Sequence, residues 1–175
     1  MRTKIYTTKK LEKLVKKLIQ TDETDETLGI LGQWNATVFY VERKKCWLFT
    51  NKMTKYNLVL SDIKASDLNN IDNIFKSALH KQLDYDGIIT DFKNIDTMIG
   101  ELDFRPTDND RSMTGFQNQR LFELDWWRGE FGSLENMPMN DLTNRMNISA
   151  VLLGKGRKMS DYTVAIREMK KIITE

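Results

Sequence analysis

Apolar side chains near the start of the chain recur with helical spacing. Five of them stand at i, i+3, i+4, i+7 and i+8: Leu11, Leu14, Val15, Leu18 and Ile19. Because this spacing places them on one face, it predicts a helix with Thr7 or Thr8 as its N-cap. The alternation over residues 2–6 allows an additional edge strand before the helix. The acidic run over residues 21–26 predicts a surface loop after it.

Three short β-rich segments follow, separated by polar turns. Residues 35–42, 46–50 and 56–60 are dominated by β-branched, aromatic and other apolar side chains. Short strands joined by tight polar turns are typical of an antiparallel meander. The first turn, at Arg43-Lys44, lacks the glycine of the usual two-residue hairpin, which leaves its turn type open.

The rest of the chain alternates between helical spacing and turns. Apolar spacing predicts a helix that begins at Ser66 or Asp67 and ends at Gly87. Residues 88–100 fit either a strand or a helix, and Leu102 to Arg105 alternates in a way that favours a return to the sheet.

Three more helices are predicted toward the C-terminus: one from Ser112 to about Trp127, a short one after Pro138, and one over residues 160–174. The pattern therefore predicts an α+β fold in a single domain over residues 1–175. A small antiparallel sheet, with a three-strand meander plus one or two added strands, would pack with about four to five helices. Residues 128–159 are less regular and can form a peripheral excursion.

Composition narrows the class of protein. The chain of 175 residues carries a net charge of +2, with a basic N-terminal segment and an acidic stretch over residues 84–110. No apolar run approaches the ~18–20 residues that span a bilayer. The single cysteine, Cys46, lies in an apolar run, which indicates a buried thiol. These features predict a cytoplasmic protein with no membrane partner.

Several short motifs resemble a family of small bacterial and phage-borne domains of unknown function. The T-K-K-L start and an N-R-S-x-x-G-x-x-N stretch are the most specific. The matching segments are residues 8–14, 34–36, 43–51, 54–56 and 110–118. The chain departs from the family at Asp110, where the family pattern has asparagine. The resemblance covers roughly residues 8–120 and the predicted helix near 139–147, and it implies an α+β fold without an assigned activity.

The stretch around residue 111 is the first candidate site. Ser112 would cap the predicted helix, and the free N–H groups at its start, with Arg111, could hold an anion. Gly115 would let a ligand or another backbone approach closely, and Asn118 completes the motif. The alternative is a helix-capping loop in which Arg111 binds an acidic neighbour.

Trp126, Trp127 and Arg128 form the second candidate. Two adjacent tryptophans on a helix cannot both face the core, so one of them points away from it. An exposed Trp126 beside Arg128 would mark a partner surface, since Trp and Arg dominate interface hot spots. The alternative is that Trp127 is core and that Trp126 packs under the following loop.

Other chemistries have weaker support in the sequence. Four carboxylates lie within residues 101–110, but they lack the spacing of a calcium loop. His80 and Cys46 are the only histidine and the only cysteine, and no nucleophile motif surrounds either. The basic loop over residues 154–158 is not a Walker A motif. We therefore expect no metal and no cofactor.

The sequence favours a protein-interaction or regulatory module of bacterial or phage origin, with no catalysis evident. Its partner surface would contain Arg111, Ser112, Gly115 and Asn118 together with Trp126 and Arg128. One alternative is a binder or hydrolase of a phosphorylated small molecule or nucleotide that uses Arg111, Ser112 and the 154–158 loop. A second alternative is a DNA-binding regulator whose basic helix contacts phosphates.

Overall fold

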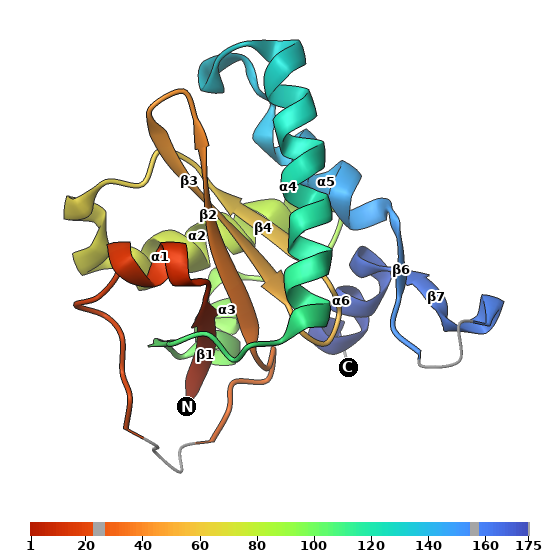
Figure 1. Ribbon diagram of the computed structural model, residues 1–175. Helices are drawn as coiled ribbons and strands as arrows, with labels where there is room; N and C mark the ends of the chain where they lie inside the picture. The colour runs from red at the N-terminus through yellow and green to blue at the C-terminus, as the bar shows by residue number, and fades with distance from the viewer. Residues whose placement is uncertain (23–26, 155–157, 175) are drawn as a thin grey trace.

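The computed structural model describes residues 1–22, 27–154 and 158–174 (Figure 1). Its main sheet has the strand order β4-β3-β2-β1-β5. The strands are β1 (Arg2–Thr7), β2 (Trp34–Val41), β3 (Lys44–Asn51), β4 (Asn57–Leu60) and β5 (Glu101–Arg105). The helices are α1 (Lys9–Leu14), α2 (Ile71–Tyr85), α3 (Phe92–Ile99), α4 (Arg111–Phe131), α5 (Met139–Ile148) and α6 (Ala165–Thr174). A separate pair joins β6 (Ala150–Leu152) to β7 (Tyr162–Val164).

The predicted α+β fold and its meander are confirmed. Strands β2, β3 and β4 pair antiparallel in sequence order. The first turn is shifted by one residue from the prediction, since Lys44 already pairs with Val41 and leaves Glu42-Arg43 as the turn. Glu42 has a φ of 56°. Both of the primed turns that join hairpin strands have a positive φ at this first central residue, and they match the right-handed twist of the strands.

The prediction of an edge position for the first strand was wrong. β1 lies inside the sheet and pairs parallel with β2 on one side and with β5 on the other. A parallel connection needs a crossover, and α1 with the segment after it supplies one between β1 and β2. The predicted return of residues 102–105 to the sheet is confirmed as β5, and β5 occupies the edge.

Helices cover both faces of the main sheet, with α2 and α3 behind it and α4 in front (Figure 1). The face toward α2 is built on aromatic rings, and we call it the aromatic face; its central rings are Trp34, Trp47, Phe49, Phe75 and Phe104. The face toward α4 and α5 is the mixed face. Its apolar end contains Val41, Cys46 and Leu48, and its polar end contains Asn35, Thr50 and Asn57.

Several element boundaries differ from the prediction. The first helix ends at Leu14, because Val15 leaves the helical region with φ −111° and ψ 23°. The chain then turns so that Ile19 bridges to Phe104 at the outer side of β5. The ambiguous segment is the helix α3, and α6 begins only at Ala165 because β7 takes the residues before it.

Part of the less regular region, from Leu134 to Met146, packs on the apolar end of the mixed face. Leu134, Met137, Leu142 and Met146 are buried there against Cys46. The buried thiol of Cys46 agrees with the sequence analysis, and burial raises its pKa above the usual value. Among the described residues, no helix is both long and apolar enough to cross a bilayer. Of the acidic run over 21–26, residues 23–26 lie outside the described part of the chain.

Candidate functional site along the longest helix

The start of α4 is set by Asp110. Its carboxylate accepts the backbone N–H of Met113 at 3.0 Å, and its carbonyl accepts the N–H of Thr114 at 2.9 Å. The prediction that Ser112 caps this helix was therefore wrong. The hydrogen bond from Met113, aided by Lys52, lowers the pKa of Asp110. A carboxylate stabilises this helix start more than a hydroxyl does, because its negative charge also complements the positive end of the helix dipole.

The predicted site residues all lie on α4, and all are exposed: Arg111, Ser112, Gly115, Asn118, Trp126 and Arg128. Arg111, Gly115, Asn118 and Trp126 follow helical spacing along one side, which we call the outer stripe of α4. Arg128 is displaced toward β2, and Ser112 toward the opposite flank. The helix thus brings four of the six residues into one line.

Two aromatic side chains project from the outer stripe. Trp126 is 65% exposed, and Phe122, one turn earlier, is 74% exposed. Trp127 is buried among Leu124, Leu134 and their neighbours at the apolar end of the mixed face. Sequence reasoning missed Phe122. The available signal was its spacing of four residues from both Asn118 and Trp126 on an otherwise polar side.

A groove of about 540 Å³ lies beside the outer stripe. Its walls come from Val38–Val41 of β2, from Lys10 of α1, and from the α4 side chains Asn118, Phe122 and Arg128. Arg128 donates a hydrogen bond to the carbonyl oxygen of Tyr40 at 3.4 Å and binds Asp125 at 2.6 Å. Two of the predicted residues therefore border a concave surface as well as lying on the helix.

The floor of this groove includes the end of β2, where the strand no longer pairs with β1. The pairing with β1 ends at Ala36, whose carbonyl accepts the N–H of Thr8 at 2.9 Å. Backbone groups of alternate residues point to the same side of a strand, so those of Val38 and Tyr40 also point away from β3. In the described part of the chain, Arg128 supplies the contact to this edge at Tyr40.

A cluster of charges surrounds the N-terminus of α4. Lys52 binds Asp108 at 2.7 Å and Asp110 at 3.3 Å, and Asn35 donates to Asp108 at 3.2 Å. Desolvation by burial lowers the pKa of Lys55 nearby. The cluster brings together three segments that are distant in the sequence: the start of β2, the turn between β3 and β4, and the residues before α4.

Arg111 stands at the edge of this cluster. It is exposed, and within the described ranges it forms no ion pair with a carboxylate. The loop in which Arg111 anchors to an acidic neighbour is therefore not the arrangement observed. Both nearby aspartates are already engaged by Lys52, which leaves the guanidinium available to a partner.

The other residues weighed in the sequence have separate environments. The ring of His80 forms a hydrogen bond with the carbonyl of Thr90 at 2.9 Å, while Cys46 lies under α4 and α5. Among the acidic residues, Asp103 is bound by Arg105 at 2.7 Å. No group of three or more potential metal ligands converges in the described ranges. Of the basic loop 154–158, residues 155–157 lie outside them.

Fold and surface together define an α+β domain with a mixed five-stranded sheet and a long helix that presents exposed aromatic residues. Residues 4–168 match a domain of unknown function, DUF6933, and the chain belongs to that family. No curated protein and no solved structure matches the chain. The family covers every segment of the site described above, including the whole outer stripe of α4.

Proposed function

We propose that this chain is a protein-interaction module whose partner binds the outer stripe of α4. The exposed pair Phe122 and Trp126 carries the proposal. Large apolar side chains that lie next to each other in solvent mark binding surfaces, and Trp and Arg are enriched among the residues that dominate binding energy. Arg111 adds a free cation at one end of the stripe, and the groove at Asn118 and Arg128 extends it sideways.

The proposed setting is a regulatory role in the cytoplasm of a bacterium or during phage infection. High use of lysine, asparagine and isoleucine supports an AT-rich genome of the kind that many phages carry. The buried free thiol of Cys46 fits a reducing compartment.

Photo-crosslinking in lysate of the source cells tests the partner surface. A photoreactive phenylalanine analogue replaces Phe122 or Trp126, and a third protein carries it at Ile89. Ile89 is a matched control because it is 87% exposed and lies between α2 and α3, outside the outer stripe. We expect one shared product at positions 122 and 126, and its loss when Arg111→Glu is added. Identical products from position 89, or none from the stripe, would reject the proposal.

The alternatives from the sequence have less support. An anion at the start of α4 would meet the carboxylates of Asp108 and Asp110, which already hold Lys52. The basic helix proposed for DNA is only 6 residues long as α1. A thermal-shift screen with nucleotides checks the first alternative, and salt-dependent binding to random duplex DNA checks the second.

A further inference from the structure

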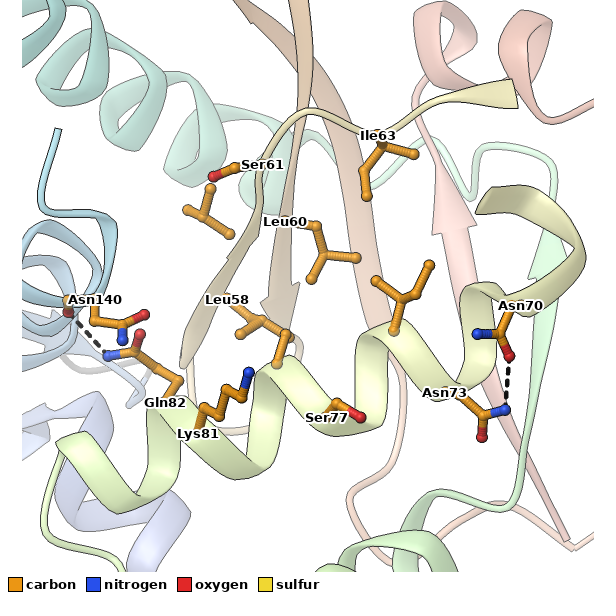
Figure 2. Close-up of a pocket in the computed structure, with 13 residues that line it drawn as sticks. Leu58, Leu60, Ser61, Ile63, Asn70, Asn73, Ser77, Lys81, Gln82 and Asn140 are labelled. Atoms are coloured by element: carbon orange, nitrogen blue, oxygen red, sulfur yellow. Dashed lines mark hydrogen bonds between the residues drawn. The ribbon is translucent and has the colours of Figure 1, made fainter. Parts of the chain in front are cut away.

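A second groove of about 400 Å³ lies between the edge strand β4 and helix α2 (Figure 2). Leu58, Leu60 and Ile63 point from the strand side toward the helix in this view. Ile74 and Ala78 of α2 complete the apolar lining. The groove is therefore an apolar channel along a sheet edge, and none of its lining residues belongs to the outer stripe of α4.

The edge of β4 already binds one amide in the manner of a neighbouring strand. The side-chain amide of Asn147, from α5, accepts the backbone N–H of Asn57 at 2.7 Å and donates to the Asn57 carbonyl at 3.0 Å. Two such bonds to one residue are what an adjacent antiparallel strand exchanges. Asn147 thus occupies the place of a partner's peptide group at the first residue of β4.

The next position on this edge is open. Because backbone groups alternate in direction, those of Val59 point to the same side as those of Asn57, away from β3. Val59 lines the groove. In the described part of the chain, no group bonds the Val59 backbone from that side. An incoming backbone can therefore continue the pairing that Asn147 begins.

The rim of the groove restricts the side chains that fit. Its polar groups are uncharged amides and hydroxyls, such as Asn73, Ser77 and Asn140, with one cation, Lys81. Among the residues that the structure describes, no carboxylate lines the groove. Lys81 is exposed on α2 and extends toward the strand in Figure 2. An acidic side chain is the charge that complements this rim.

We propose that the groove between β4 and α2 binds an extended peptide segment of another protein, which adds to the sheet at Val59. One small aliphatic side chain of the segment packs against Ala78 and Ile74, and one acidic side chain meets Lys81. Main-chain hydrogen bonds to the edge supply affinity, and the two side-chain positions supply selectivity. This surface is separate from the stripe on α4, so either proposal stands without the other.

Selection from a phage-displayed library of random peptides identifies the probe. The full chain is the target, and Ala78→Arg is the counter-target because its side chain fills the channel. Enriched peptides are then synthesised with blocked ends and titrated into isotope-labelled protein. We expect the amide signals of Val59, Ser77 and Lys81 to shift, and the enriched peptides to share an acidic residue.

Two variants test the backbone and the charge separately. Val59→Pro removes the outward N–H without removing a bond of the β3–β4 ladder, and it should weaken binding about tenfold. Lys81→Glu should weaken binding by at least about threefold, while Lys93→Glu, an exposed lysine on α3, should leave it unchanged. N-methylation of the peptide residue opposite Val59 should act like Val59→Pro.

Three results would overturn the proposal: enrichment no stronger than on the Ala78→Arg protein, shifts confined to α4, or affinity that is indifferent to N-methylation. The last result would mean a ligand held by side chains alone. Sedimentation of the full chain examines self-association, and dimers that Val59→Pro abolishes would identify a second copy as the occupant instead. Failure at α4 in the crosslinking experiment leaves these outcomes unaffected.

Discussion

The two faces of the main sheet are held by different forces. On the aromatic face, Phe75 of α2 meets Trp34 edge to face at 5.4 Å and Phe49 at 4.9 Å between ring centroids. On the polar end of the mixed face, Asn35, Thr50 and Asn57 stand side by side across three strands. One face depends on apolar area and ring packing, and the other on directed hydrogen bonds.

The polar row determines where the helices of the mixed face lie. Gln117 of α4 donates to the carbonyl of Asn35 at 3.0 Å and to the Thr50 hydroxyl at 3.3 Å. Asn147 of α5 binds both Asn57 and, at 3.2 Å, the carboxylate of Asp86. Apolar contact tolerates small shifts, whereas these bonds fix register and angle. We therefore expect ring packing on the aromatic face to contribute more to stability than the polar row. The hydrogen bonds of the polar row fix the position of α4 and its outer stripe.

The largest effect should come from the aromatic face. Phe75→Ala removes a fully buried ring from the contact with Trp34 and Phe49, and we expect the free energy of unfolding to fall by about 3–5 kcal/mol. Denaturant unfolding measures the loss. If Phe75→Ala lowers the free energy of unfolding by less than Asn147→Ala does, the order expected for the two faces is wrong.

The next effect should come from Asn147→Ala. The substitution leaves the N–H and carbonyl of Asn57 without their partner, and an unsatisfied buried group costs about 1–3 kcal/mol. Asn144→Ala is the matched control on the same helix, because Asn144 has one bond, to Asp86, and lies partly exposed. Equal costs for the two variants would contradict the special role of the amide at β4.

Asp110→Ala should have a smaller effect, a loss of about 1 kcal/mol from the helix cap. Asp110→Asn keeps a cap acceptor, so it should cost less than alanine. Thermal unfolding of the three proteins at neutral pH gives this order. If asparagine and alanine are equivalent, the cap does not hold the start of α4.

The same residue predicts a pH dependence. The folded protein lowers the pKa of Asp110, so its contribution is complete above the unfolded value of about 4 and is lost as the pH falls through the folded value. Unfolding followed from neutral to acidic pH should show the difference between wild type and Asp110→Asn narrowing toward low pH. A difference that is constant with pH would exclude the ionised cap.

The smallest effect on stability should come from the outer stripe. Phe122→Ala and Trp126→Ala remove exposed side chains, and each should change the free energy of unfolding by no more than about 0.5 kcal/mol. The same substitutions should abolish the crosslinked product proposed for this surface. A large loss of stability would mean that the rings pack on the fold and are not a partner surface.

The sequence was informative wherever a local pattern determined the outcome. The meander over β2–β4, the helix α2 and the return of β5 could be predicted because alternation and helical spacing are local properties. The interior position of β1 could not, since its alternation is compatible with either an edge or a centre. Only the distant partner β5, supplied by Glu101–Arg105, decides between them.

The site was predictable in part for the same reason. The helix predicted from Ser112 contained Gly115, Asn118 and Trp126, but Arg111 lay outside it. The structure caps the helix at Asp110, two residues earlier, and so includes Arg111 in α4. The groove at the β4 edge gave no signal at all. Its lining combines residues of β4, α2 and α5, and no local pattern in the sequence shows that these elements pack together.

The central placement of β1 also sets the order in which the sheet can form. The meander closes through short turns, whereas Arg2 must find Glu101 across 99 positions of the chain. Contacts between distant segments form slowly, because closing the intervening loop costs entropy before the contacts contribute any stabilisation. Refolding should therefore finish with the β1–β5 pair, and a chain still being synthesised cannot complete its sheet until Arg105 has left the ribosome.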